Sequence, residues 1–274
     1  MNLVELYKNL YQDLIKLASV AGIDEKGLQK YFAPNNNKTE DFYFERLCAS
    51  LQNSGNMSNS IKLRDGNDGN RVAIKAALCD FNLKSAYKKF NGGESIYEEF
   101  TKKQGIEDKG SKSKRETNWE KYSIGIWDGI KFLKKEKGVD TINILIADKV
   151  LTDNALDENI ETIKNIQGKI HGLGFALTCD WLKECGCEWL AKPDVHIRKV
   201  LEHVYGLDNI KEEDVLHKVY EWSETINSES TDKKVTAYKI DKAIWLLCTG
   251  NFYLDNVKIG RESVLRRIDD FKLI

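Results

Sequence analysis

Apolar residues recur at steps of three and four positions along most of this 274-residue chain, which is the spacing of amphipathic helices. The stripe is clearest at the N-terminus, in Leu3, Leu6, Tyr7, Leu10, Leu14, Leu17 and Ala18. Only two prolines, Pro34 and Pro193, interrupt helices of this kind. The sequence therefore predicts an all-α protein.

Several boundaries of these helices can also be predicted. Thr39 is a capping residue followed by acidic residues, so a helix is expected to begin there. Asn53–Asn70 is rich in Gly, Asn and Ser and reads as a long loop, whereas Thr141–Leu151 fits either a strand or a helix. Further helices are predicted near Arg71–Asp80, Leu83–Phe90, Trp119–Lys137, Asn159–Gln167, Glu212–Ile226, Tyr238–Thr249 and Arg261–Phe271.

The composition excludes several classes of protein. With 41% hydrophobic residues and 42 basic against 43 acidic ones, the chain is not disordered throughout. No run approaches the roughly 18 apolar residues of a membrane span, and Glu5, Lys8 and Asp13 interrupt any signal peptide. We therefore expect a cytoplasmic protein whose six cysteines are reduced thiols.

Charge is unevenly spread along the chain. Thr101–Lys121 has seven basic and four acidic residues, whereas Leu207–Asp232 has two basic and eight acidic ones. The first segment could face an anionic polymer and the second should face away from it, or both could be ordinary solvated loops.

The segment with the strongest chemical signal runs from Asn159 to Leu201. A predicted helix ends near Gly168, since glycine is common just after the end of a helix. A turn with Gly172 and Gly174 then leads into a second helix. Glycines allow close backbone approach, and a helix N-terminus attracts phosphate oxygens. The pattern fits a phosphate-binding hairpin or a simple interhelical turn.

An aspartate follows the second helix at a position that predicts a helix N-cap. In KPDVHIRKVL, Asp194 would accept backbone N–H bonds, which keep a carboxylate ionised and fixed in direction. Most such aspartates are caps and nothing more, but a glycine hairpin, a helix and a capped aspartate in series are much less common than any one of them.

Together these motifs resemble the helix-hairpin-helix superfamily of DNA glycosylases typified by endonuclease III. The family pattern L-P-G-V-G-x-K-T-A, with an aspartate 18 residues after its lysine, matches KIHGLGFALTCDWL and KPDVHIRKVL. The lysine position falls on Ala176, and Asp194 follows it by 18 residues. His171 stands where the family usually has proline. Similarity extends from about Phe42 to Leu201 through DFYFERLCASLQNS and NWEKYSIGIWDGIKFLKKEKG.

The resemblance implies a two-domain all-α fold with the active-site cleft between the domains. Residues 39–183 would form a central helical barrel domain that contains the hairpin. Residues 1–38 and 184–274 would form a second helical domain from both termini.

Two departures from the family narrow the expected chemistry. Ala176 cannot act as the amine nucleophile of strand-cutting members, so no abasic-site lyase activity is expected. Only Cys248 follows Asp194, so the four-cysteine iron–sulfur cluster of many relatives is not expected. Cys179, Cys185 and Cys187 make a poor zinc set and are interpreted as structural thiols. We expect no cofactor, apart from a possible monovalent cation at the hairpin carbonyls.

The resemblance also suggests roles for individual residues. Asp194 would be catalytic, and Gln52 would fill the space left by an extruded base. Base-stacking candidates are Tyr43, Tyr122, Trp127 and Trp181, although aromatic residues at helical spacing more often belong to a core. The expected contacts to the DNA backbone are Lys169, Ile170, His171, Gly172, Leu173, Gly174 and Arg198.

The predicted function is a monofunctional DNA glycosylase, expected to act as a monomer. It would flip a modified or damaged base out of double-stranded DNA and hydrolyse its N-glycosidic bond, leaving an abasic site. Base-excision repair and defence against phage DNA with modified bases are both open. The alternative is a non-catalytic DNA-binding or damage-sensing protein with the same scaffold. A nuclease is disfavoured because no acidic cluster for two metal ions is evident.

Overall fold

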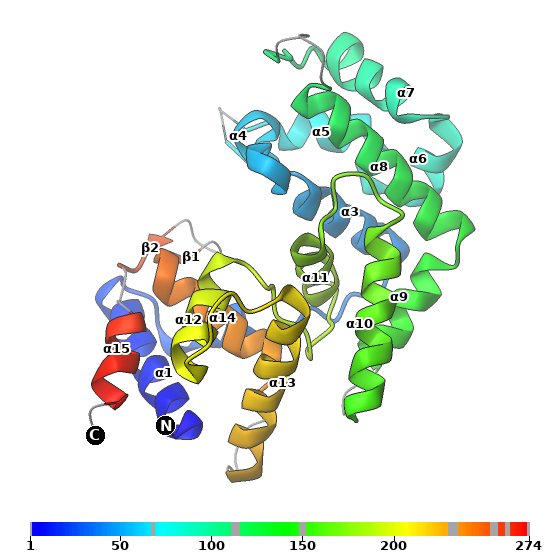
Figure 1. The fold of residues 1–274 in the computed structure, drawn as a ribbon. Helices are drawn as coiled ribbons and strands as arrows, with labels where there is room; N and C mark the ends of the chain where they lie inside the picture. Colours follow the sequence, from blue (N-terminus) through cyan, green and yellow to red (C-terminus); the bar gives the residue numbers. More distant parts are fainter. Residues whose placement is uncertain are drawn as a thin grey trace. The chain divides into compact units, whose positions relative to one another are not determined.

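The computed structural model describes residues 2–66, 69–110, 116–147, 152–229, 235–252, 257–260 and 264–272. The chain divides into two compact units, which we call unit 1 (Met1–Asn35 with Cys187–Ile274) and unit 2 (Asn36–Gly186). Figure 1 shows that both consist almost wholly of helices, so the all-α prediction is confirmed for these residues. None of the helices described is long and apolar enough to span a bilayer.

Unit 1 combines both ends of the chain. Its elements are α1 (Leu3–Val20), α2 (Glu25–Phe32), α12 (Val195–Tyr205), α13 (Glu212–Glu229), α14 (Ala237–Thr249), β1 (Asn251–Phe252), β2 (Val257–Lys258) and α15 (Val264–Lys272). The two short strands pair antiparallel. Helix α14 contacts α1, α12, α13 and α15, and its buried residues include Ile240, Leu246 and Leu247. Helix α14 therefore lies at the centre of unit 1, and the helices that contact it share one hydrophobic core.

Unit 2 contains the longer run of helices. Its elements are α3 (Glu40–Leu51), η1 (Ser54–Asn56), α4 (Ser58–Ile61), α5 (Arg71–Ala77), η2 (Cys79–Phe81), α6 (Leu83–Lys89), α7 (Gly93–Glu98), η3 (Glu99–Lys103), α8 (Asn118–Lys135), α9 (Gly138–Ala147), α10 (Asp153–Gln167) and α11 (Phe175–Glu184). Helix α8 contacts α3, α4, α6, α7 and α9 and runs through the middle of the unit (Figure 1).

Local sequence explains where the main helices of unit 2 begin. Thr39 accepts a hydrogen bond from the backbone N–H of Phe42, as the capping pattern predicts. At α8, Thr117 and Glu120 form a reciprocal capping box, in which each side chain accepts the backbone N–H of the other residue. Because α8 is therefore fixed at its start, it can serve as the frame for the segments packed against it.

Two segments differ from the sequence reading. Asn53–Asn70 is not a plain loop, because it contains η1 and α4, and Met57 and Ile61 in it are buried. These two apolar side chains fold the segment back onto the unit. In the ambiguous segment Thr141–Leu151 the described residues are helical, as part of α9, and 148–151 lie outside the described residues.

Candidate functional site

In unit 2, α10 and α11 are joined by a tight turn, Gly168–Gly174, which we call the hairpin. Its apolar side chains point inward, since Ile170 and Leu173 are only 3% and 2% exposed. His171, Gly172 and Gly174 are exposed. Two buried anchors therefore hold the glycine-containing tip at the surface.

The backbone geometry assigns different roles to the three glycines of the hairpin. Gly172 has φ of +78°, a left-handed conformation that favours glycine. Gly174 is the N-cap of α11 and is extended. Gly168 is the C-cap of α10, at the helix end where the sequence predicts it, and it is right-handed with φ of −63°.

The hairpin leaves two backbone donors unused. The N–H groups of Gly172 and Gly174 donate no hydrogen bond to any described residue. Because Gly174 has no side chain, nothing caps the first turn of α11 either. Exposed amides at a helix N-terminus are the arrangement that binds an anionic oxygen.

The other predicted backbone contacts are occupied within the hairpin. The amides of Lys169, Ile170 and Leu173 donate to carbonyls inside the turn or at the end of α10. The Lys169 ammonium lies 2.7 Å from a carboxylate oxygen of Glu136 and 5.8 Å from the centre of the Phe132 ring. Among the predicted main-chain donors, Gly172 and Gly174 therefore remain available.

Helix α8 supports the hairpin from behind. The backbone N–H of His171 donates to Asp128 Oδ2 at 3.1 Å, and its imidazole Nε2 lies 3.3 Å from Glu116 Oε2, just before α8. A Cβ placed on Gly125 would come within 2.6 Å of the carbonyl oxygen of His171. Sequence reasoning missed these supports, although Gly125 and Gly129, four residues apart in a predicted helix, were a signal of close packing.

In unit 1, Asp194 is the N-cap of α12, as predicted. Its Oδ1 accepts hydrogen bonds from the backbone N–H groups of His196 at 2.9 Å and Ile197 at 3.3 Å. Its Oδ2 makes no hydrogen bond to the described residues. One oxygen therefore fixes the direction of the carboxylate while the other stays available.

The charges of Asp194 and Arg198 change the pKa of two other side chains, Cys248 and Glu212. Burial, and then the negative charge of Asp194, raise the pKa of the Cys248 thiol to about 11. Burial raises the pKa of Glu212, and the positive charge of Arg198 opposes that shift. The Arg198 Nε is buried without a hydrogen-bond partner. Arg198 thus lies close enough to Glu212 to influence it, and its Nε is not presented to solvent for a phosphate.

Gln52 ends α3 and is half-buried. Its side-chain oxygen accepts the backbone N–H of Leu63 at 2.9 Å. In this structure Gln52 therefore ties together the two ends of the segment that contains η1 and α4, instead of extending as a wedge.

Three of the four base-stacking candidates are core residues of unit 2. Tyr43, Tyr122 and Trp181 have no exposed surface. The Tyr43 hydroxyl donates to Asn143 at 2.7 Å, that of Tyr122 donates to the carbonyl of Cys48 at 3.0 Å, and the Trp181 indole donates to the carbonyl of Tyr43 at 2.9 Å. Because each ring is enclosed and its polar atom is paired, none offers a face to a base.

Trp127 is the partly exposed member of the set. Its ring is nearly parallel to that of Tyr87, at 9° with centroids 6.3 Å apart, and the Lys135 ammonium lies 5.7 Å from the centre of the Tyr87 ring.

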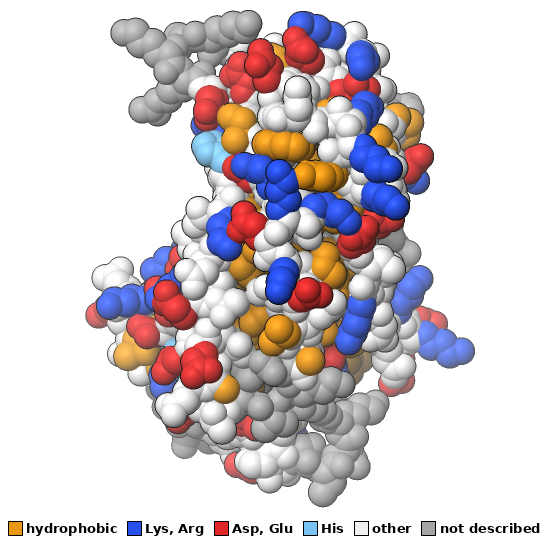
Figure 2. Space-filling view, turned by 90° about the vertical axis from the view of Figure 1, so that its right-hand side faces the viewer, with side chains coloured by type: hydrophobic (Ala, Val, Ile, Leu, Met, Phe, Trp, Pro, Cys, Tyr) orange, Lys and Arg blue, Asp and Glu red, His pale blue; other side chains and the backbone are white. Residues whose placement is uncertain are grey.

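Figure 2 shows Lys and Arg side chains beside exposed hydrophobic ones on the face of unit 2 that lies at the right of Figure 1.

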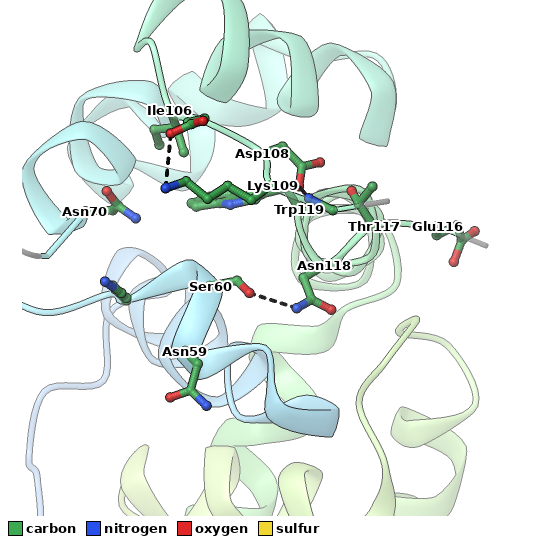
Figure 3. Close-up of a pocket in the computed structure, with 13 residues that line it drawn as sticks. Asn59, Ser60, Asn70, Ile106, Asp108, Lys109, Glu116, Thr117, Asn118 and Trp119 are labelled. Carbon is green, nitrogen blue, oxygen red and sulfur yellow. Dashed lines mark hydrogen bonds and ion pairs between the residues drawn. The ribbon is translucent and has the colours of Figure 1, made fainter. Parts of the chain in front are cut away.

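A polar cavity of about 590 Å³ opens in unit 2, and we call it the amide pocket (Figure 3). The Asn118 side-chain amide donates to Ser60 Oγ at 2.9 Å across its floor, which joins α8 to α4. Glu116, the partner of His171, also lines it. The lining residues are Asn59, Ser60, Lys62, Asn70, Ile106, Glu107, Asp108, Lys109, Gly110, Glu116, Thr117, Asn118 and Trp119.

No metal centre is evident in the described part of the chain, where no group of three or more His, Cys, Asp or Glu side chains could hold an ion. Cys179, Cys185 and Cys187 are buried, and burial raises the pKa of Cys185. The basic run within Thr101–Lys121 lies partly outside the described residues, at 111–115. On its described side, Lys102, Lys103 and Lys109 pair with Glu98, Glu99 and Glu107.

Comparison with known proteins gives no relative. No protein-family model, curated protein or solved structure matches the chain.

Proposed function

We propose that the chain is a monofunctional DNA glycosylase that removes a modified or damaged base from double-stranded DNA. The single observation that carries the proposal is the geometry of Asp194, whose Oδ1 is held by two backbone N–H groups while Oδ2 stays unbonded among the described residues. The proposal includes the two-domain helix-hairpin-helix arrangement.

The hairpin would grip one DNA strand. The unpaired N–H groups of Gly172 and Gly174, at the uncapped start of α11, would donate to phosphate oxygens. This contact reads no sequence, so it suits a protein that searches DNA for a rare base. It also explains how a chain of net charge −1 can bind a polyanion, because main-chain donors supply part of the attraction.

Asp194 would act on the sugar of the extruded nucleotide. As the N-glycosidic bond breaks, positive charge develops on the sugar, and a fixed carboxylate stabilises that charge. The available oxygen can also orient or deprotonate the attacking water. The products are the free base and an abasic site.

No amine is available at the family's nucleophile position. Ala176 lies in the first turn of α11, and the nearby Lys169 is paired with Glu136. We therefore propose base hydrolysis without strand cleavage. Neither Gln52 nor the rings of Tyr43, Tyr122 and Trp181 enters this proposal as a direct contact to the base, since all four are engaged within unit 2.

The test is a base-release assay. The protein would be incubated with duplexes that carry a panel of alkylated, deaminated, oxidised or bulky modified bases, and abasic sites would be revealed by hot alkali. We expect the wild-type chain to release the base from at least one duplex and Asp194→Asn to release it from none. Duplex binding without base release anywhere in the panel would instead favour a non-catalytic DNA-binding or damage-sensing protein.

A further inference from the structure

The amide pocket is not used by the hairpin grip or by Asp194, and its lining retains unused hydrogen-bonding groups. The Asn70 side-chain nitrogen donates to the carbonyl of Ile61 at 3.0 Å, and that of Asn118 donates to Ser60. Among the described residues, the side-chain oxygens of Asn70 and Asn118 accept no hydrogen bond, and the side-chain amide of Asn59 makes none. Figure 3 shows Asn59, Asn70 and Asn118 coming from different segments around the cavity.

The charged side chains that line the pocket differ in whether they have a partner. Both carboxylate oxygens of Asp108 accept hydrogen bonds, from Gly110 and Tyr97, and Lys109 lies 3.4 Å from Glu107. Lys62 forms no ion pair with a described residue. Of the two lysines in the lining, Lys62 is therefore the one without an acidic partner among the described residues.

These features define the chemistry of a ligand. Primary amides recognise groups that carry donors and acceptors side by side, as the edge of a nucleobase does. An unpaired lysine suits a phosphate. A cavity of about 590 Å³ falls within the range of about 300–1,000 Å³ typical of small-molecule sites. A base with its phosphate is the ligand class that uses both features.

The pocket also adjoins the proposed DNA grip. Glu116 lines the pocket and contacts the His171 imidazole at 3.3 Å, one residue from Gly172. A Cβ on Gly172 would lie 3.8 Å from Ser54 Oγ, in the segment that leads into α4. A strand held at the hairpin would thus pass close to the walls of the pocket.

We infer that the amide pocket binds a nucleotide, with Asn70 and Asn118 reading the base edge and Lys62 holding the phosphate. One source of such a nucleotide is an unpaired position of the bound DNA strand, and in that case the inference rests on the proposed DNA-binding function. A free mononucleotide has the same chemistry and is the second source.

The experiment tests the two sources separately, one with duplex DNA and one with free mononucleotides. Fluorescence anisotropy would compare a labelled, unmodified duplex with the same duplex carrying one extra unpaired nucleotide, in four versions for the four bases. Isothermal titration calorimetry would measure binding of the four deoxynucleoside 5′-monophosphates. The variants are Lys62→Gln and Asn118→Leu, with Lys75→Gln, an exposed lysine of α5 outside the pocket, as the matched control.

We expect the wild-type chain and Lys75→Gln to prefer at least one bulged duplex, or to bind at least one mononucleotide. Loss of a charge-assisted hydrogen bond should weaken that binding roughly tenfold in Lys62→Gln. Preference only for the bulge identifies a strand nucleotide, and mononucleotide binding identifies the free ligand. Equal affinities of wild type, Lys62→Gln and Asn118→Leu in both arms would overturn the inference. Base release by the wild-type chain is measured separately, so failure here leaves the glycosylase proposal standing.

Discussion

The carbonyl oxygen of His171 lies 2.6 Å from the position that a Cβ on Gly125 would occupy, so the hairpin rests directly on the backbone of α8. Only a residue without a side chain permits this approach, because a contact under about 3 Å to a backbone atom forces a shift. The surface that we propose for DNA binding is thus positioned by a helix about 43 residues earlier in the chain.

Gly125→Ala should therefore displace the hairpin. We expect a lower melting temperature and a severalfold loss of affinity for duplex DNA, since overpacking typically costs about 1–3 kcal/mol. Gly168→Ala is the matched control at the entry to the hairpin, where a Cβ would meet only carbonyl oxygens at 3.7 Å. Thermal melting and fluorescence anisotropy would check both, and wild-type binding by Gly125→Ala would contradict the close contact.

Gly172→Val should weaken binding to every duplex, with or without a modified base. A branched side chain at φ of +78° strains the turn and blocks the approach of a phosphate to the glycine amides. Gly22→Val is the control, because Gly22 has the same φ of +78° but lies in unit 1. We expect similar destabilisation of both variants and a loss of affinity of roughly tenfold for Gly172→Val alone. Equal binding by the two would refute the hairpin grip.

Glu99 should contribute to stability in a pH-dependent way. It is buried, and its two carboxylate oxygens each lie 2.9 Å from an ammonium group, that of Lys89 or that of Lys103. Burial alone would raise the pKa of Glu99, but these two lysines offset burial and hold the pKa below its usual 4.5. A lowered folded-state pKa means that the stabilisation is present above about pH 4.5 and is lost as the pH falls through the folded value.

Glu99→Gln should accordingly lower the free energy of unfolding by roughly 1–2 kcal/mol at pH 7, and by much less at pH 3. Glu98→Gln, which breaks an exposed pair with Lys102, should cost about 0.5 kcal/mol or less at either pH. Urea unfolding at the two pH values gives both numbers. A penalty for Glu99→Gln that stayed the same at pH 3 would rule out this ion-pair explanation.

Much of the fold follows from periodicity, whereas the supports of the site do not. The stripe of α1, the cap at Thr39 and the N-cap Asp194 are visible in sequence because each depends on residues within one helical turn. The contact of His171 with Asp128 joins residues 43 positions apart, and no local pattern reports it. Burial of Tyr43 and Trp181 likewise depends on which helix faces are covered, which period alone does not decide.

The loop segments show the same limit. Asn53–Asn70 is rich in residues that favour turns, yet Met57 and Ile61 anchor short helices there, because two buried side chains outweigh weak propensity. Gly168 ends α10 as the sequence predicts, but it is right-handed, and the positive φ of the hairpin lies at Gly172.

Borohydride should trap no covalent adduct between the wild-type chain and a substrate duplex. Schiff-base formation needs an amine at the sugar, and Ala176 has none. Strands should therefore break only after alkali. A trapped adduct would identify another amine as the nucleophile, and Lys169→Gln would test the nearest one in the hairpin, which is otherwise paired with Glu136.

The most direct test of the account is single-turnover base release by Asp194→Asn on the best substrate of the panel, with duplex affinity measured on the same preparation. Asparagine keeps the size of the side chain and a cap oxygen for His196 and Ile197, but it lacks the charge that stabilises the developing cation. We predict a loss of base release of about 100-fold or more, or roughly 2.7 kcal/mol in the barrier, with duplex affinity within about threefold of wild type. Full base release by Asp194→Asn would contradict the proposed mechanism.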